Sequence, residues 1–494
     1  MTHTDTPVGK LFRGLDRRLG AAKFTKSGLN YVFPEHFSFL FGEVALYSFV
    51  ALVATGIFLM LFYSPSETKT IYDGSYLPLQ GVEMSEAYRS VMRLSFDVRA
   101  GLLMRQIHHW AALVFTGAVA AHLCRVFFTG AFRKPRELNW VTGVILLMVI
   151  LLEGFMGYSL LDDMLSGAGV RIANAVVESI PVIGSTATFW LWGGEYPGSG
   201  FLGRLLTLHI FLMPALITIL IAIHLVLVAR PKHTQFPGKG RAEHNVVGTR
   251  MWPTYMTMST GLAFMVGGVL VIMGGWLQIN PVWLYGPYDP FTITSGAQAD
   301  YYVLWIQGAL RLMPPWEFRA WGVTIPNPFF PGILLPAVLF GLLFAWPWLE
   351  ALATKDWQNH HVLDRPRDRP VRTGLGVAAI TLITLLLVAG SDDVIAVEAN
   401  WSIVTFRNVE RFLLIILPVI TGVFAYYFAR DLSRAKPLEV DAPTEPPKPE
   451  PAFVPAPESA GQGSTPTGSR LLRGGVFVAL SAAIMRRFRR RSDR

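Results

Sequence analysis

Eight apolar runs, separated by polar and charged segments, divide the chain along most of its length. They cover residues 37–63, 106–128, 139–161, 203–228, 256–277, 329–349, 374–390 and 411–429. A helix of about 20 apolar residues crosses the hydrocarbon core of a bilayer, so each run is a candidate transmembrane helix. The pattern therefore predicts an all-α, polytopic membrane protein with eight transmembrane helices.

The composition supports this prediction and excludes an ordinary soluble protein. Hydrophobic residues make up 52% of the chain and charged residues only 16%, too few to cover a soluble protein of this length. The first 36 residues are polar and basic, unlike a cleavable signal peptide. Four regions are expected: a cytoplasmic N-terminal segment at 1–36, four-helix regions at 37–230 and 231–430, and a cytoplasmic tail at 431–494.

Basic residues indicate how the helices are oriented. Lys and Arg gather at both ends of the chain and in the loops near 129–138, 229–252 and 350–373. With eight spans these segments share one side, and basic loops face the cytoplasm. We therefore expect a multi-pass protein of the cell membrane with both termini in the cytoplasm. The net charge of +9 then reflects orientation rather than nucleic-acid binding.

The tail, Pro-rich and then basic and amphipathic, is expected at the lipid surface.

Cysteine usage limits the redox centres that the chain itself can hold. The only cysteine is Cys124, inside the second apolar run. One thiol excludes a disulfide within the chain, a Cys₄ iron–sulfur cluster and covalent CxxCH haem attachment. Any such centre must belong to a partner protein.

Histidines are the unusual feature of the apolar runs. The second run contains MRQIHHWAALVFTGAVAAHLCRVF, with His108 and His122 separated by 14 positions, and the fourth has His209 and His224 separated by 15. Both spacings are close to four helical turns, about 21 Å, so each pair lies on one helix face but is too far apart to share a metal. If the helices face each other, His108 meets His209 (the outer pair) and His122 meets His224 (the cytoplasmic pair). His109 points about 100° away from this face.

Paired imidazoles at two depths predict axial ligation of two haems. Glycines in the neighbouring runs repeat the same spacing, with 14 positions between members of each pair. The flat haem macrocycle also has to fit between neighbouring helices, and it can approach a helix closely where there is no side chain. The glycines are Gly42 and Gly56 in the first run and Gly143 and Gly157 in the third.

The sequence also resembles a known family, the cytochrome b subunits of quinol:cytochrome c reductases and their photosynthetic relatives. The resemblance is carried by GLLMRQIHHW, HLCRVFFTGAFRKPRELNWVTGV, GFMGYSLLDD, ESIPVIGS and RLLTLHIFLMPALITILIAIHLVL. It covers about residues 30–430 and is most specific in 95–230. The tail and the motif HTQFPG after the fourth run resemble the actinobacterial branch, which implies menaquinol as substrate.

This resemblance implies roles for residues around the haems. The outer pair would hold a low-potential haem and the cytoplasmic pair a high-potential haem, both b-type and non-covalent. Arg105 and Arg125 resemble the arginines that pair with haem propionates. Arginine matches a carboxylate well, although snorkelling to the interface is a simpler reading of both.

The quinol-oxidation motif of the family, Pro-Glu-Trp-Tyr, is altered here. The corresponding loop reads PPWEF at 314–318, so the carboxylate is displaced by two positions. A carboxylate beside an apolar pocket can accept a proton from quinol. Glu153, a charged residue inside the third run, is the competing acceptor. The expected residues of this site are Pro314, Pro315, Trp316, Glu317 and Glu153.

Other departures from the family affect both quinone sites. In GYSLLDD, Leu161 and Asp162 replace Pro-Trp after Tyr158, and the family lines its quinol pocket where Gly167, Gly169 and Val170 fall. On the cytoplasmic side, Arg230, Lys232 and His233 follow the fourth run, and one of them is the expected donor to a quinone carbonyl. The acidic residue that the family has at the start of the fifth helix is replaced by Ser259.

Together these features predict the dihaem cytochrome b of a respiratory quinol:cytochrome c reductase. The implied partners are a Rieske-type iron–sulfur subunit, a cytochrome c subunit, a terminal oxidase, membrane lipid and a second copy of the chain. Two other classes stay open. A dihaem membrane anchor of a quinone-linked dehydrogenase would not need four further spans, and a transporter with intramembrane histidines would hold no haem.

Overall fold

The computed structural model describes residues 20–435 except Pro197, 293–297 and Trp321, together with Gly14, Asp16 and Arg18. The expected basic, amphipathic end of the tail lies outside these residues. The rest of the chain up to Ala435 forms one compact unit. The predicted division at 230–231 falls between the fourth and fifth spans.

Eight helices of the described chain are long and apolar enough to cross a membrane, which confirms the predicted fold class. Three of them contain a short π-helical stretch (η3, η4 or η5), and the first begins with a 3₁₀ turn (η1). In chain order they are η1 (Phe37–Phe39) with α3 (Leu40–Met60), α5 (Gly101–Thr129), α6 (Glu137–Ser159), α9 (Phe201–Thr207) with η3 (Leu208–Leu212) and α10 (Met213–Ala229), η4 (Met251–Tyr255) with α11 (Met256–Trp276), η5 (Phe330–Leu334) with α14 (Leu335–Thr354), α15 (Pro370–Ala389) and α17 (Ile403–Arg434).

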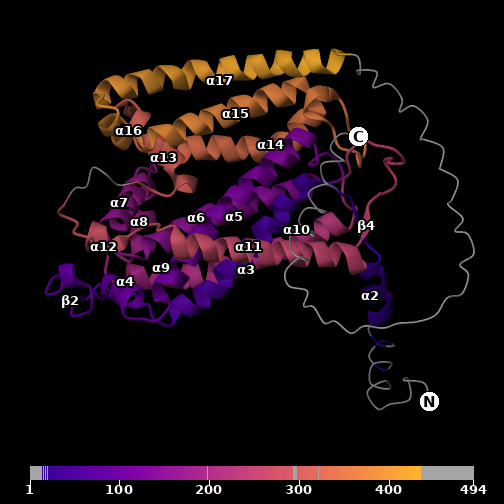
Figure 1. Cartoon of the computed structure of the whole chain (residues 1–494). Coiled ribbons are helices and arrows are strands. Elements are labelled where there is room, and N and C mark those ends of the chain that lie inside the picture. Colours follow the sequence, from indigo (N-terminus) through magenta and orange to yellow (C-terminus); the bar gives the residue numbers. More distant parts are fainter. Residues whose placement is uncertain are drawn as a thin grey trace, which may run out of the picture. The chain divides into compact units, whose positions relative to one another are not determined.

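The first four spans make a bundle on which the later spans pack (Figure 1). Helix α3 lies along α5, and α6 along α10, while α11 covers α3 and α5. Helices α15 and α17 form a layer that contacts the bundle through α13 (Tyr301–Leu312) and α15. Between the two histidine levels the bundle interior is filled by apolar side chains, including Phe115, Ile150 and Ile217.

Short elements connect the spans, and none of them was predicted, because they lack a long apolar run. The remaining helices are α2 (Ala21–Leu29), α4 (Glu86–Phe96), α7 (Met164–Glu178), α8 (Gly184–Trp192), α12 (Val282–Tyr285), α16 (Asp392–Glu398) and the 3₁₀ turns η2 (Leu77–Leu79) and η6 (Pro366–Asp368). The antiparallel strand pairs are β1 (Val32–Phe33) with β4 (Thr249–Arg250), β2 (Lys69–Ile71) with β3 (Glu83–Ser85), and β5 (Phe318–Ala320) with β6 (Val323–Ile325).

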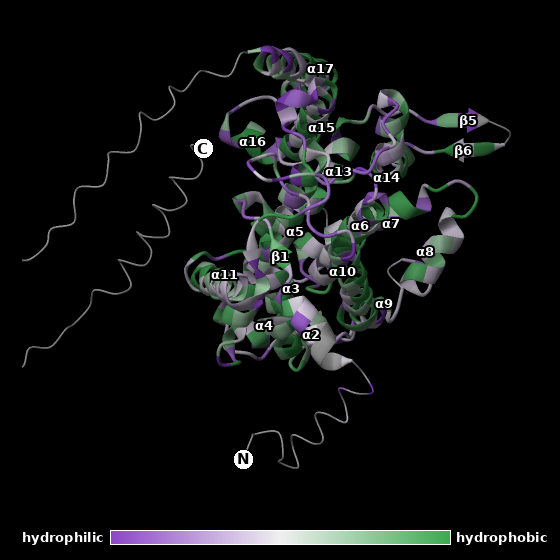
Figure 2. Ribbon diagram, turned by 90° about the vertical axis from the view of Figure 1, so that its right-hand side faces the viewer, coloured by the Kyte–Doolittle hydropathy of each residue, from purple (hydrophilic) through white to green (hydrophobic). Residues whose placement is uncertain are grey.

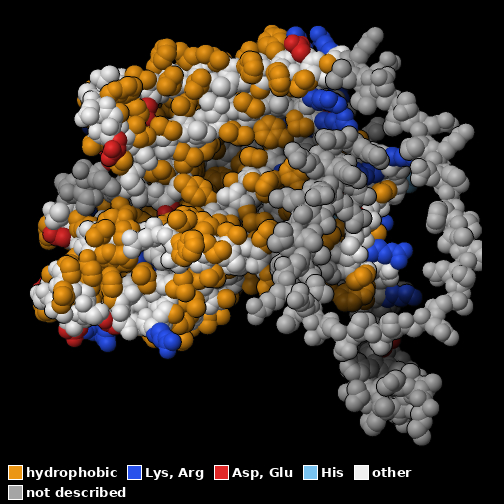
Figure 3. Space-filling model, in the orientation of Figure 1, with side chains coloured by type: hydrophobic (Ala, Val, Ile, Leu, Met, Phe, Trp, Pro, Cys, Tyr) orange, Lys and Arg blue, Asp and Glu red, His pale blue; other side chains and the backbone are white. Residues whose placement is uncertain are grey.

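The flanks of the spans expose large apolar side chains, as a lipid-facing surface requires. Trp276 is 87% exposed, Phe264 77% and Ile415 74%, and hydrophobic residues colour the outward faces of the long helices (Figure 2). In the space-filling view, Lys and Arg gather at the right-hand end, where α2 and β4 lie, and hydrophobic side chains cover the flank (Figure 3). This is the end that the charge distribution assigns to the cytoplasm.

Candidate functional site

The structure brings the four predicted histidines together as two pairs inside the first four spans. The ring centroids of His108 and His209 are 6.2 Å apart, and those of His122 and His224 are 6.3 Å apart. In both pairs one ring comes from α5 and the other from the fourth span. The histidines therefore meet by depth, as their spacing along the chain predicts.

A π turn explains why the spacing is 14 in one helix and 15 in the other. His209 lies in η3, the π-helical stretch Leu208–Leu212 between α9 and α10. A π turn accommodates one extra residue in an otherwise α-helical segment, and such turns are frequent at functional sites. The extra residue between His209 and His224 is absorbed there, so both rings keep the same helix face as the pair on α5.

The geometry of both pairs fits a haem iron. A metal–imidazole bond is about 2 Å long and a ring nitrogen lies about 1 Å from its centroid, which places two rings on opposite sides of one metal about 6 Å apart. No cluster of three or more His, Cys, Asp or Glu that could hold a metal occurs in the described part of the chain. Two opposed imidazoles alone suit a metal that brings its other ligands with it, as haem iron does.

Each of the four predicted glycines faces one of these imidazole rings. A Cβ built on Gly56 would lie 3.4 Å from His108 and one on Gly42 3.4 Å from His122, while Gly143 would contact His224 at 3.6 Å. A Cβ on Gly157 would lie only 2.5 Å from Cε1 of His209. The glycines thus make room for the histidine rings, and of the four only Gly157 has no room for a Cβ beside its ring.

The second ring nitrogen has a different environment in the two pairs. In the outer pair, Nδ1 of His108 lies 2.9 Å from Oγ1 of Thr55, and Nδ1 of His209 lies 3.0 Å from Oε1 of Glu153. Partners of this kind set the tautomer and orientation of a ligand ring. Among the described residues, Nδ1 of His209, His122 and His224 has no partner with hydrogen-bond geometry. Only His108 is hydrogen-bonded at this atom, and the contact of His209 with Glu153 is one of ion-pair distance. The half-buried carboxylate of Glu153 therefore lies beside the ring of His209.

Of the two predicted propionate arginines, Arg105 is buried and Arg125 is half-buried, and they are held differently. Arg105 donates from Nη1 and Nη2 to the carbonyl of Asn280, at 3.1 and 3.2 Å. Arg125 lies over the ring of Phe39 at 4.2 Å, and its Nε and Nη2 have no hydrogen-bond partner within the described chain. A buried guanidinium with unused donors fits an anionic group that the polypeptide does not supply.

The PPWEF loop is largely exposed in this chain. It follows α13 and leads into β5. Trp316 is 65% exposed, and the Glu317 side chain is 50% exposed and lies 3.3 Å from Arg319. The backbone is ordered by a hydrogen bond from Asn327 to the carbonyl of Pro314, next to Pro315. The described residues of this chain therefore leave the carboxylate of Glu317 half exposed.

Residues after the third span form a buried polar cluster beside Tyr158. The hydroxyl of Tyr158 is buried without a hydrogen-bond partner among the described residues, and a Cβ on Gly169 would lie 3.6 Å from its ring. Asp163 caps α7 by accepting from the amide of Ser166 at 2.7 Å. Burial raises the pKa of Asp163 to about 6, against the hydrogen bonds from Ser166, which lower it.

His233 lies in an aromatic cluster at the end of the bundle that holds the cytoplasmic pair. Its ring centroid is 4.9 Å from that of Phe33 and 6.0 Å from that of Tyr31. Burial, together with the positive charges of Arg125 and Arg136, lowers the pKa of His233 to about 4. The imidazole is therefore neutral at physiological pH and keeps one N–H as a donor.

Two clusters of polar side chains were not predicted from the sequence. His109 lies 3.0 Å from the carboxylate of Asp300, which also accepts from Tyr302 at 3.0 Å, so it points away from the haem face. In the first span, Glu43 accepts hydrogen bonds from Tyr255 and Ser259. A carboxylate inside an apolar run is a signal that the sequence contained, but its partners on distant helices were not foreseeable.

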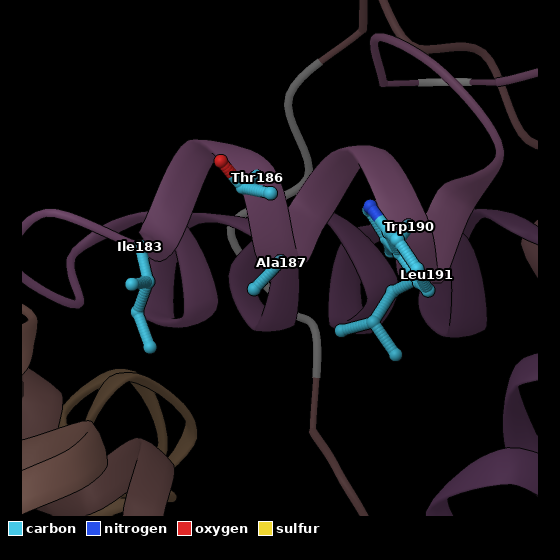
Figure 4. A pocket seen from close by; sticks show the side chains of 5 residues that line it. All are labelled: Ile183, Thr186, Ala187, Trp190 and Leu191. Atoms are coloured by element: carbon cyan, nitrogen blue, oxygen red, sulfur yellow. The ribbon is translucent and has the colours of Figure 1, made fainter.

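A surface hollow on α8 contains none of the predicted site residues. It is lined by Ile183, Thr186, Ala187, Trp190 and Leu191, all on or next to one short helix (Figure 4). Trp190 is 77% exposed. The hollow belongs to the apolar surface of this helix, whereas the histidine pairs lie inside the bundle.

Comparisons with known proteins show which family the chain resembles. The family model described as "Cytochrome b(N-terminal)/b6/petB" matches residues 113–287. The cytochrome bc1 complex cytochrome b subunit of Mycobacterium leprae is 47% identical over 422 residues, 85% of this chain and 76% of that protein. The same subunit of Corynebacterium diphtheriae is 46% identical over 428 residues, 87% and 79% of the two chains.

A third relative and a solved structure also match the chain. The cytochrome b subunit of Streptomyces coelicolor is 45% identical over 412 residues, 83% of this chain and 75% of that protein. A chain of a structure titled "Hyperthermophilic respiratory Complex III" matches with a TM-score of 0.61 at 20% identity, covering 84% of this chain and 99% of that one, which supports the fold. The predicted resemblance to the actinobacterial branch is confirmed. The chain belongs to the cytochrome b subunits of the cytochrome bc1 complex, membrane proteins that carry b-type haem.

Proposed function

We propose that this subunit binds two b-type haems at two depths and catalyses quinol:cytochrome c oxidoreduction within its complex. Quinol is oxidised at the outer side, one electron leaves to an iron–sulfur protein, and the other crosses the membrane to a quinone near the cytoplasm. Protons are released outside and taken up inside. The observation that supports this proposal most strongly is the pair of opposed imidazoles at each depth, with centroids 6.2 and 6.3 Å apart.

The chain's own residues hold and separate the two redox centres. When bound, the haems supply one-electron centres. The outer pair and the cytoplasmic pair would ligate the irons, and Arg105 and Arg125 would pair with the propionates. The apolar cluster around Phe115 fills the space between the two levels and excludes water from it. Low-dielectric packing of this kind keeps protons from following the electron across the membrane.

At the outer side, Glu317 is the proposed proton acceptor, with Pro314, Pro315 and Trp316 shaping its loop. The exposure of Trp316 and Glu317 fits a site that a partner subunit closes. A Rieske-type iron–sulfur subunit supplies the electron acceptor there, because Cys124 alone cannot hold a cluster. The position of Glu153 beside His209 favours a role in orienting that ligand over proton acceptance from quinol.

The wider assembly follows from the same family. A cytochrome c subunit receives the electron from the iron–sulfur protein, a terminal oxidase can join the complex, and a second copy of this chain makes a homodimer. The substrate is menaquinol, as implied by the actinobacterial relatives, and both termini are cytoplasmic. Four spans beyond the haem bundle and the PPWEF loop disfavour a simple dihaem anchor of a dehydrogenase.

The test of this proposal is the haem content of histidine variants of the purified complex. His122→Ala should remove only the haem of the cytoplasmic pair and His209→Ala only that of the outer pair, because each haem depends on its own two rings. His109→Ala is the matched control and should keep both, since His109 contacts Asp300 instead.

Redox titration of the b-band absorbance would separate the two haem signals. Two unchanged signals in His122→Ala or His209→Ala would overturn the assignment of ligands. A wild-type preparation without haem would overturn the proposed function and favour a transporter.

A further inference from the structure

A carboxylate in the first transmembrane span is held by hydroxyl groups from the fifth. Glu43 lies in the first turn of α3. Its Oε1 accepts a hydrogen bond from Tyr255 at 2.6 Å, and its Oε2 accepts one from Ser259. Tyr47 lies 2.5 Å from the Ser259 hydroxyl, so a short chain of hydroxyls ends on the carboxylate. A charge inside a membrane span is costly and is rarely kept without a function.

This carboxylate lies beside the cytoplasmic histidine pair. Gly42, the residue before it, faces the ring of His122. Tyr255 stacks on Phe33 with 3.8 Å between ring centroids and 7° between ring planes, and Phe33 in turn contacts His233. The pairing of Phe33 with Thr249 fixes the N-terminal segment against the start of the fifth span. Glu43 therefore adjoins an aromatic cluster built around His233.

The same region contains a buried donor that the described chain does not satisfy. The hydroxyl of Tyr31, whose ring centroid is 6.0 Å from that of His233, has no hydrogen-bond partner among the described residues. Aromatic walls with a few polar donors are typical of a site for a small, mostly apolar ligand. A quinone headgroup, a flat ring with two carbonyl acceptors, has the matching chemistry.

We propose that Glu43 passes protons from the cytoplasmic side to the quinone that is reduced at this site, and that Tyr255 and Ser259 hold its carboxyl group in place. The proposal rests on the proposed function. One quinone takes up two electrons and two protons and becomes a quinol, and the haem that the cytoplasmic pair would hold would supply the electrons one at a time. For each proton, a quinone oxygen gains the O–H bond that the Glu43 carboxyl loses, and the carboxylate is protonated again from the cytoplasm.

The experiment measures how fast reduced haem is reoxidised by quinone in the purified complex with all its subunits. Haems are pre-reduced with limiting dithionite under anaerobic conditions, mixed with a short-chain naphthoquinone, and followed by stopped-flow absorbance. Glu43→Gln keeps two polar atoms for Tyr255 and Ser259 but cannot carry the proton, so reoxidation should slow by about 100-fold, the scale for loss of a general acid–base group. Glu43→Asp should recover at least a tenth of the wild-type rate.

Two further variants separate proton transfer from a structural role. Tyr255→Phe removes one hydrogen bond and leaves the carboxylate, and it should slow reoxidation far less than Glu43→Gln. Glu137→Gln, in the first turn of α6 at the same end of the bundle, is the matched carboxylate control and should behave as wild type.

The outcomes distinguish this proposal from the function on which it rests. A wild-type rate in Glu43→Gln would overturn the proton role. So would an equal loss in Glu43→Gln and Tyr255→Phe together with an altered haem spectrum, because that pattern indicates a structural link between α3 and α11. Absence of quinone-dependent reoxidation in the wild type would overturn the proposed function itself.

Discussion

The four glycines that face the imidazole rings differ in the space that each would leave for a Cβ atom. The Cβ positions at Gly42, Gly56 and Gly143 lie 3.4 to 3.6 Å from the nearest ring atom, at or near ordinary contact distance, whereas that at Gly157 lies 2.5 Å from His209. The sequence pattern treated the four as equivalent because spacing reports only helix face. Which glycine is indispensable depends on how closely two helices approach, and that is a tertiary property.

We therefore expect Gly157→Ala and Gly143→Ala to differ. The added methyl group of Gly157→Ala would displace the ring of His209, and neither α6 nor its neighbours can move far in a close-packed bundle. The outer haem signal should fall to less than half of its wild-type amplitude in a redox titration. Gly143→Ala should keep both signals, and equal loss in the two variants would show that the glycines serve packing in general.

Asp162 gives a prediction for the pH dependence of stability. It has a positive φ of 54° and accepts a hydrogen bond from Ser85 at 2.5 Å. Burial raises its pKa to about 6, against the lowering effect of Ser85. A carboxyl with a raised folded pKa contributes stability that is complete below its unfolded pKa of about 3.9 and lost as the pH rises through about 6.

Asp162→Asn should therefore stabilise the protein most at high pH. Asparagine tolerates positive φ and can still accept from Ser85, but it carries no charge. The gain in unfolding free energy should be about 1 to 2 kcal/mol at pH 8 and smaller at pH 5. Thermal unfolding of variant and wild type at both pH values measures this, and an equal gain at both would contradict the assigned pKa.

At the scale of helices, the sequence predicted the number and type of spans well and their ends less well. The last apolar run was placed at 411–429, whereas α17 extends over Ile403–Arg434. Its first turns carry Arg407, which donates to Asp392 on α16 at 2.5 Å. Hydropathy detects only the lipid-facing part of a helix, so turns stabilised by ion pairs at the membrane surface escape it. The π turn at His209 escaped for a related reason, because one extra residue leaves the apolar pattern intact.

The π turn makes a prediction about deletions in the fourth span. Removing Phe211, a lipid-exposed residue inside η3, should convert the π turn to regular α-helix and leave His209 facing His108, so both haems should be retained. Removing Ile219, an equally apolar and exposed residue in regular α10, should rotate His209 by about 100° relative to His224. The outer haem should then be lost. Identical haem content in the two deletion variants would mean that the π turn does not set the register.

At the scale of the whole molecule, the two halves of the chain are joined at the end assigned to the cytoplasm. Arg372 at the start of α15 binds Glu350 of α14 and lies 3.0 Å from Asp364, and Asp364 lies 3.3 Å from Arg133 in the loop after α5. Such contacts tie the haem bundle to the later spans, and they explain why the described chain is one compact unit. Charge counting predicted which end is basic but not that its charges form a shared network, since pairing depends on loops far apart in sequence.

Orientation in the membrane follows from this basic end and can be measured with single cysteines. The chain has only Cys124, which lies within α5, so an introduced cysteine can be read against a low background. Lys69 on β2 and His244 in the loop before η4 are both exposed. Basic segments stay in the cytoplasm because their transfer across the membrane is disfavoured.

In intact protoplasts, a membrane-impermeant maleimide should therefore label Lys69→Cys and leave His244→Cys unlabelled until the membrane is permeabilised. Wild-type protein measures the background from Cys124, and labelling after denaturation gives the total for each variant. The reverse pattern would place the basic end outside. The cytoplasmic histidine pair and Glu43 would then face the outer compartment, where quinone reduction would take protons from the wrong side.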